Sequence, residues 1–303
     1  MTATSASPSP ARTPLTGTAL LVVAGVLWGA GGLAGSYLAN RAGVGPVAVA
    51  AYRLLCGGAL IVLYAAATGR RFTGSAGAAV WNRVGLSGLL LATFQAAYFA
   101  AVTATSVGLA TLTTMVAVPV LITVGTAGLD RRLPDARTAG AVTLAVVGLF
   151  LLLGGAGVPG GPVLAGAALA LLAAASFATL SLWHARSDAT SDAGDLGLGF
   201  LAGGLVLLPF ALASGMALPL RPDALGALGF LVLLPTAVAY VAYFTALRRS
   251  RPGAAVIGVL LEPLTATALS VAFADERLSA VQVAGAVLVL VSITLQAATP
   301  TRN

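Results

Sequence analysis

The chain has 303 residues, of which 58% are apolar and only 8% are charged, and its mean hydropathy is +0.99. A soluble domain carries roughly a quarter charged residues, so this composition excludes a water-soluble globular protein. The net charge of +7 does not indicate nucleic-acid binding, because the arginines lie at the ends of apolar runs and not on one soluble face.

The apolar runs are unbroken and about 20 residues long, which is the length of a spanning helix and not of a barrel strand. We therefore predict an all-α integral membrane protein. Residues 1–15 are rich in Ser, Thr, Pro and Ala and are expected to form a disordered tail. Ten transmembrane helices are predicted, at about Thr18–Ala39, Pro46–Thr68, Val84–Thr103, Val107–Leu129, Thr138–Leu153, Val163–His184, Leu196–Ser214, Asp223–Leu247, Pro252–Ala274 and Ala280–Ala298.

The two halves of the chain resemble each other at an offset of 145 positions. Tyr98-Phe99 returns as Tyr243-Phe244, and the turn Asp130-Arg131-Arg132-Leu133 returns as Asp275-Glu276-Arg277-Leu278. We therefore expect a five-helix repeat in residues 16–154, a linker in 155–162 and a second five-helix repeat in 163–298.

Arginine counts in the loops predict the orientation. If the N-terminus is cytoplasmic, twelve arginines lie inside and three, Arg41, Arg221 and Arg277, lie outside. Both termini are therefore expected in the cytoplasm. A repeat with an odd number of spans must be inverted relative to its copy, and inverted repeats are typical of secondary transporters with a substrate site near the midplane.

Glu262 is the only carboxylate deep within an apolar run. An ionisable group there costs about 2.5–3.5 kcal/mol on insertion scales, so it is a functional candidate. It is expected either to couple transport to protons or to act as a protonated structural carboxyl. Gln95 and Tyr98 share one helix face, and their repeat mates are Tyr240 and Tyr243. These four side chains are expected to line a central cavity or to form hydrogen bonds between helices.

Other polar and aromatic residues complete the candidate site. Trp28 lies among glycines whose spacing permits close helix packing, so it is expected either to pack or to form a wall of the substrate site. Thr114 is expected either to join the lining or to bond to its own helix. Arg53 is expected either to contact an anion or to make a structural contact, including snorkelling to the outer interface. Pro119 and Pro263 break backbone hydrogen bonds and are predicted bending points for gating, or static kinks.

The chain resembles the EamA-type branch of the drug/metabolite transporter superfamily. The residues that carry the resemblance are Trp28-Gly29, Arg53, Pro119, Leu261-Glu262-Pro263 and Asp275-Glu276-Arg277-Leu278. The family's turn is usually Gly-Glu-Arg-apolar, and the first copy here lacks the Glu. The resemblance implies ten helices around a central cavity, a place in a bacterial cytoplasmic membrane, and export or exchange of amino acids or other small metabolites.

We predict a secondary active transporter that works by alternating access, since the sequence has no nucleotide-binding motif. The expected partners are a small-molecule substrate and membrane lipids, with no enzyme activity, cofactor, metal or nucleic acid, and the oligomeric state is left open. The candidate substrate-binding residues are Trp28, Gln95, Tyr98, Thr114, Tyr240, Tyr243 and Glu262. The alternatives are an intramembrane enzyme and a non-transporting membrane scaffold.

Overall fold

The computed structural model describes residues 14–69, 78–131, 133, 135–154, 161–186, 193–249, 255–273 and 277–297. Within these residues every regular element is helical. The α-helices are α1 (Pro14–Asn40), α2 (Pro46–Ala67), α3 (Ala78–Ala104), α4 (Val107–Asp130), α5 (Ala136–Gly154), α6 (Gly161–Arg186), α7 (Ala193–Ala213), α8 (Pro222–Val232), α9 (Ala239–Arg249), α10 (Ala255–Phe273) and α11 (Ala280–Ala297), and a π-helical turn, η1 (Leu233–Val238), joins α8 to α9.

The predicted all-α class is confirmed for the described part of the chain. Seven of its helical segments are long and apolar enough to cross a membrane, and three shorter apolar segments lie in α5, α10 and α11. The number of transmembrane helices, ten, therefore remains a prediction. Residues 1–13 of the predicted tail and 155–160 of the predicted linker lie outside the described residues, as do residues 250–254, whereas residues 14–15 belong to α1 and 161–162 to α6.

Local signals in the sequence account for several helix ends. Pro46 occupies the first turn of α2, where its missing N–H is not needed. The side chain of Ser106 caps α4 by accepting a hydrogen bond of 3.2 Å from the N–H of Leu109. Arg131 ends α4 in the left-handed conformation, with φ at 51°. These signals place the ends of α2 and α4 within one or two residues of the predicted bounds.

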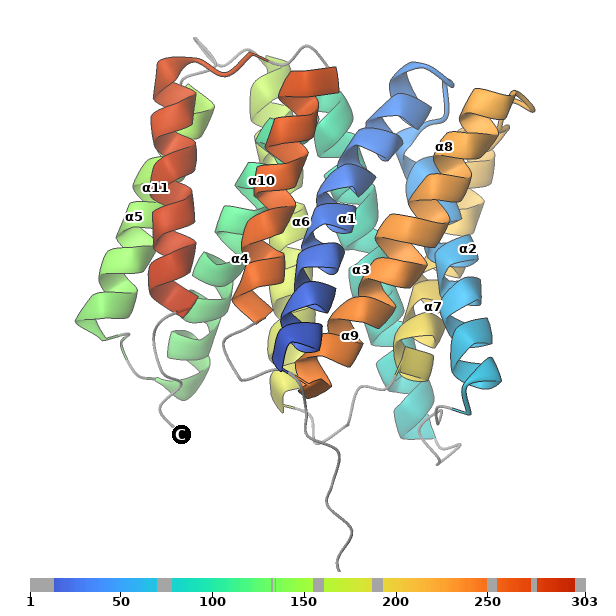
Figure 1. The fold of residues 1–303 in the computed structure, drawn as a ribbon, viewed down its shortest axis with the longest axis horizontal. Coiled ribbons are helices and arrows are strands. Elements are labelled where there is room, and N and C mark those ends of the chain that lie inside the picture. The colour runs from blue at the N-terminus through green and yellow to red at the C-terminus, as the bar shows by residue number, and fades with distance from the viewer. Residues whose placement is uncertain are drawn as a thin grey trace, which may run out of the picture.

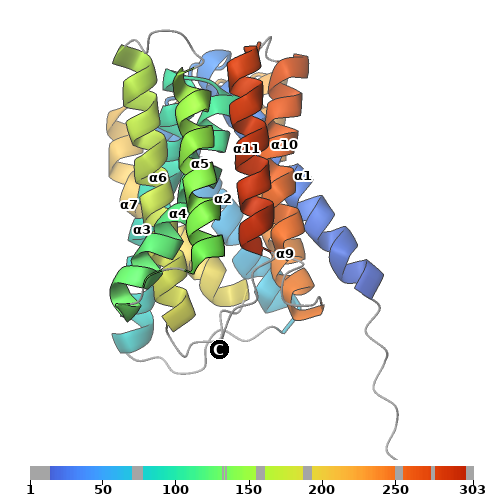
Figure 2. The same cartoon turned by 90° about the vertical axis from the view of Figure 1, so that its left-hand side faces the viewer.

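The helices stand side by side in one bundle (Figure 1), and α1 begins and α11 ends at its lower end. α5 packs against α11 as a pair at one side of the bundle (Figure 2). α2 packs against α7, and α1 packs against α10 and α9. α3 packs mainly on α6 and α7 and less on α4, although only two residues separate α3 from α4.

Small residues allow this close packing, as expected for helices in lipid. A Cβ added at Gly148 of α5 would lie 2.9 Å from the carbonyl oxygen of Gly285 of α11. A Cβ added at Gly29 of α1 would lie 2.6 Å from the carbonyl oxygen of Glu262 of α10. The close helix approach predicted from the glycines around Trp28 is therefore confirmed.

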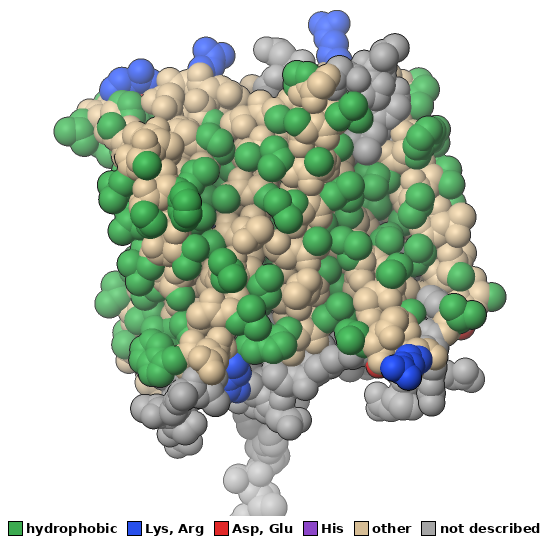
Figure 3. Space-filling view, turned by 180° about the vertical axis from the view of Figure 1, so that it is seen from behind, with side chains coloured by type: hydrophobic (Ala, Val, Ile, Leu, Met, Phe, Trp, Pro, Cys, Tyr) green, Lys and Arg blue, Asp and Glu red, His purple; other side chains and the backbone are tan. Residues whose placement is uncertain are grey.

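The outer surface of the bundle is apolar between its two ends. Figure 3 shows hydrophobic side chains over the middle of one face and arginine side chains toward the two ends. Large apolar residues such as Leu63, Phe150, Phe210 and Val287 are more than half exposed. An apolar band with charges at both ends suits a multi-pass membrane protein.

Candidate substrate site

Arg53 lies inside the bundle, near the middle of α2, and is only 6% exposed. Its Nε donates a hydrogen bond of 3.1 Å to Oγ1 of Thr236, and its Nη1 donates one of 3.1 Å to Oε1 of Gln95. Its guanidinium carbon also lies 5.8 Å from the centre of the Phe99 ring, within the range of a cation–π contact. Arg53 therefore does not snorkel to the interface but holds together helices from both halves of the chain.

Thr236 binds Arg53 from the π-helical turn η1. In an α-helix the N–H of residue 235 would donate to the carbonyl of Leu231, but Pro235 has no N–H. The hydroxyl of Thr236 donates to that carbonyl instead, at 2.8 Å, and accepts from Arg53 at the same time. The hydroxyl thus replaces the backbone bond that Pro235 removes and connects the irregular turn to α2.

Gln95 and Tyr98 lie on the inner face of α3 and are buried. The Oη of Tyr98 is 2.7 Å from Oγ1 of Thr111 of α4. Oε1 of Gln95 accepts from Arg53, whereas its buried Nε2 has no hydrogen-bond partner among the described residues. One end of this amide is therefore held and the other is an unpaired donor.

An aromatic cluster lies on the second-half side of the bundle. The ring of Trp28 is 5.1 Å from that of Tyr240 and 4.9 Å from that of Tyr243. The Tyr240 ring also meets Phe200 of α7 edge-on at 4.9 Å. Nε1 of Trp28 is buried without a hydrogen-bond partner in the described part of the chain. The repeat mates Tyr240 and Tyr243 are thus placed together against α1.

Glu262 lies half-buried on α10, where its backbone carbonyl meets Gly29. Its carboxyl group is close enough to interact electrostatically with Arg53, Tyr98, Tyr240 and Tyr243. Its side chain forms no hydrogen bond or ion pair with any described residue. The three tyrosines therefore lie near a half-buried carboxyl, Glu262, and the buried Arg53 does not form an ion pair with it.

Thr114 is the predicted site residue that lies apart from these contacts. It is fully buried in α4, and its hydroxyl donates across to the carbonyl of Ala170 of α6 at 3.4 Å. It bonds neither to its own helix nor to Arg53.

Pro119 is half-buried within α4 and Pro263 is buried within α10. The gating role of the two prolines stays a prediction.

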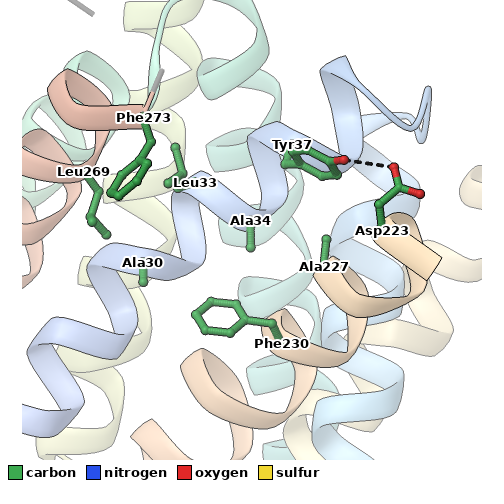
Figure 4. A pocket seen from close by; sticks show the side chains of 9 residues that line it. All are labelled: Ala30, Leu33, Ala34, Tyr37, Asp223, Ala227, Phe230, Leu269 and Phe273. Atoms are coloured by element: carbon green, nitrogen blue, oxygen red, sulfur yellow. Dashed lines mark hydrogen bonds between the residues drawn. The ribbon is translucent and has the colours of Figure 1, made fainter. Parts of the chain in front are cut away.

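A groove of about 480 Å³ lies at the upper end of the bundle between α1, α8 and α10 (Figure 4). It is lined by Ala30, Leu33, Ala34 and Tyr37 of α1, Asp223, Ala227 and Phe230 of α8, and Leu269 and Phe273 of α10. The hydroxyl of Tyr37 donates to Oδ2 of Asp223 at 2.9 Å, and Arg221 forms an exposed ion pair with the same carboxylate. The rest of the lining is apolar.

Sequence reasoning missed Thr236 and the Tyr37–Asp223 contact. Pro235-Thr236 in the middle of an apolar run was the available signal for the first, since proline there removes a backbone bond that a hydroxyl can replace. The second had a weaker signal, a carboxylate directly after Arg221-Pro222 at the start of the predicted eighth helix.

The chain is similar in sequence to known transporters and in fold to a solved structure. The sequence model of the EamA-like transporter family matches residues 164–297. A protein of Bacillus subtilis (strain 168) described as the uncharacterized transporter YwfM is 29% identical over 285 residues, which are 93% of this chain and 94% of YwfM. A solved crystal structure is 21% identical, covers 93% of this chain and 96% of its own, and has a TM-score of 0.63.

At 21% identity the solved structure shows a shared fold and nothing more. The family match and the similarity to YwfM bear on function, because each points to membrane transport. The match of residues 164–297 to the EamA-like transporter family and the similarity to YwfM agree with the resemblance that the sequence motifs predicted.

Proposed function

We propose that the chain is a secondary active transporter that exports or exchanges a small metabolite across a bacterial cytoplasmic membrane by alternating access. One observation carries the proposal. Arg53 bonds to Gln95 of the first half and to Thr236 of the second half inside an apolar bundle, and Glu262 interacts electrostatically with Arg53. Charged groups buried between spanning helices are costly and mark substrate or ion pathways.

The helix contacts support two inverted five-helix repeats. In such repeats α1 corresponds to α6, α2 to α7, α3 to α8–α9, α4 to α10 and α5 to α11. The packing of α1 on α10 then has its mate in the packing of α6 on α4, and that of α3 on α6 in the packing of α8–α9 on α1. The helix α2 packs on α7, its own repeat mate, and α5 packs in the same way on α11. This pattern is what a two-fold relation between the halves requires.

The ends of the bundle suggest which parts move. At the end that carries Arg221, the hydrogen bond between Tyr37 and Asp223 joins α1 of the first half to α8 of the second. Rocking of one half against the other would break this contact when that end opens. The arginine distribution favours the outside of the cell for this end, and on that orientation we infer that the described conformation is closed toward the outside at this contact.

The experiment is a transport screen with the purified full-length protein in liposomes. Vesicles preloaded with a panel of amino acids and small organic acids are tested for counterflow of each labelled compound, with and without a proton gradient. The proposal expects saturable exchange of at least one compound above empty liposomes. Conversion of a lipid or solute without movement would favour an enzyme, and the absence of both would favour a scaffold.

A further inference from the structure

We infer that Arg53 and Gln95 form a subsite for a carboxylate group of the substrate, with Thr236 as its positioning residue. The inference rests on the proposed transport function and adds to it the chemical class of the substrate.

The charge of Arg53 is buried and forms no ion pair with a described residue. The side chain is 6% exposed, and no carboxylate of a described residue lies within ion-pair distance of it. Its described hydrogen-bond partners, Gln95 and Thr236, are both neutral. Burying a cation without an anion is strongly unfavourable, so such a site favours an anionic ligand.

The donors next to this cation are also incomplete. The hydrogen bond from Arg53 Nη1 to Oε1 of Gln95 fixes the orientation of the amide, which leaves the Nε2 of Gln95 as the free donor. That nitrogen is buried without a partner, on a residue that is 0% exposed. Arg53 Nη2 forms no described hydrogen bond either. Two side chains that bond to each other thus each carry a donor, Nη2 of Arg53 and Nε2 of Gln95, without a described hydrogen bond.

A carboxylate fits these donors better than other anions. Its two oxygens can accept one hydrogen bond from the planar guanidinium and one from the amide of Gln95. One guanidinium balances one negative charge, whereas a phosphate dianion would bring a second charge with no described cation to balance it. Glu262 does not fill the position, since its side chain forms no ion pair with Arg53.

Thr236 holds the guanidinium in the orientation that this subsite needs. Its hydroxyl accepts from Nε at 3.1 Å, and Nη2 keeps one hydrogen that points away from the edge it shares with Nε. The hydroxyl is itself held by its bond to the carbonyl of Leu231. Because Nε and Nη1 of Arg53 are both hydrogen-bonded, Nη2 is held in one position. This lowers the entropy cost of binding a carboxylate there.

The test measures binding, and it is independent of transport. The unfolding temperature of the purified full-length protein is followed with increasing concentrations of straight-chain monocarboxylates, from acetate to octanoate, and of their amides. We expect a saturable rise with at least one carboxylate and no rise with the matched amide. Equal rises with acid and amide, or no rise with any carboxylate, would overturn the inference.

Variants separate the subsite from general stability. Gln95→Glu places a carboxylate beside Arg53, so it should raise the unfolding temperature without ligand and weaken carboxylate binding by about tenfold or more. Thr236→Val should weaken carboxylate binding, whereas Thr236→Ser should restore it. Arg221→Gln, at the exposed ion pair, is the matched control and should bind as the wild type does.

Two outcomes are decisive against the subsite and leave the transport proposal standing. One is undiminished carboxylate binding in Gln95→Glu, and the other is undiminished binding in a folded Arg53→Gln variant. If Arg53→Gln does not fold, the Gln95→Glu variant decides alone. Failure of every compound to move in liposomes would instead contradict the transport function.

Discussion

Nε of Arg53 donates a hydrogen bond of 3.1 Å to Oγ1 of Thr236, across 183 residues of sequence and from one half of the chain to the other. The same hydroxyl donates to the carbonyl of Leu231, which Pro235 leaves without its usual partner. The Thr236 side chain therefore satisfies both the Leu231 carbonyl at the π-helical turn and the buried Arg53 of α2.

Thr236→Val should lower the free energy of unfolding by about 2–4 kcal/mol, because it leaves two buried groups, Nε of Arg53 and the Leu231 carbonyl, without a partner. Thr113→Val is a matched control. Thr113 is equally buried, but its hydroxyl has no hydrogen-bond partner among the described residues, so this change should be neutral or stabilising. Thermal unfolding in one detergent measures both, and equal losses in the two variants would contradict the role of Thr236.

Gly35→Ala should destabilise the protein by roughly 1–3 kcal/mol through overpacking. A Cβ at Gly35 would lie 2.0 Å from the ring of Phe99, which meets the Tyr98 ring edge-on and has the Arg53 guanidinium over its face. Gly85→Ala in α3 is the control, because nothing lies within 4 Å of its Cβ position. That change should be neutral or stabilising by up to about 1 kcal/mol. Similar unfolding temperatures for the two variants would argue against the described α1–α3 packing.

The sequence predicted the helical class and the ends of α2 and α4. Each rests on a local signal, such as an apolar run, Pro46 at a first turn or Ser106 as a cap. The π-helical turn was not predicted, because a Pro in an apolar run is equally compatible with a kink. The Arg53–Thr236 and Thr114–Ala170 bonds could not be predicted either, since they join residues that no sequence period relates.

Glu262→Gln tests proton coupling. The variant keeps the size of the side chain but cannot titrate, so the protein should fold and still exchange substrate while it loses accumulation driven by a proton gradient. Counterflow and gradient-driven uptake are compared in the same liposome preparation. Accumulation at the wild-type rate, with the wild-type pH dependence, would leave Glu262 as a packing residue.

The predicted topology is tested with single cysteines at Ala156 and Ala189, two positions outside the described residues. Both are introduced into a Cys56→Ser background, because the native Cys56 is exposed. In intact cells a membrane-impermeant thiol reagent should label Ala156→Cys from outside, and Ala189→Cys should react only after the cells are opened. The reverse pattern would contradict cytoplasmic termini.

Tyr37→Phe removes the hydrogen bond that joins α1 to Asp223, and Arg221 remains to pair with the carboxylate. Loss of one hydrogen bond of about 1 kcal/mol should shift the equilibrium toward the outward-open form roughly fivefold. The readout is the labelling rate of Ala34→Cys in the groove by the impermeant reagent, again in the Cys56→Ser background. Thr143→Val, which removes a hydroxyl bonded only within α5, is the control. Unchanged labelling in Tyr37→Phe would show that this contact does not close the outer end.

The most direct test of the central claim is substrate exchange by reconstituted wild-type protein, Arg53→Gln and Arg221→Gln, compared at equal protein content. The substrate is the best compound of the transport screen. We predict that the wild type and Arg221→Gln exchange it at similar rates and that Arg53→Gln is slower by at least about tenfold. Exchange by Arg53→Gln at the wild-type rate would contradict a substrate site at the centre of the bundle.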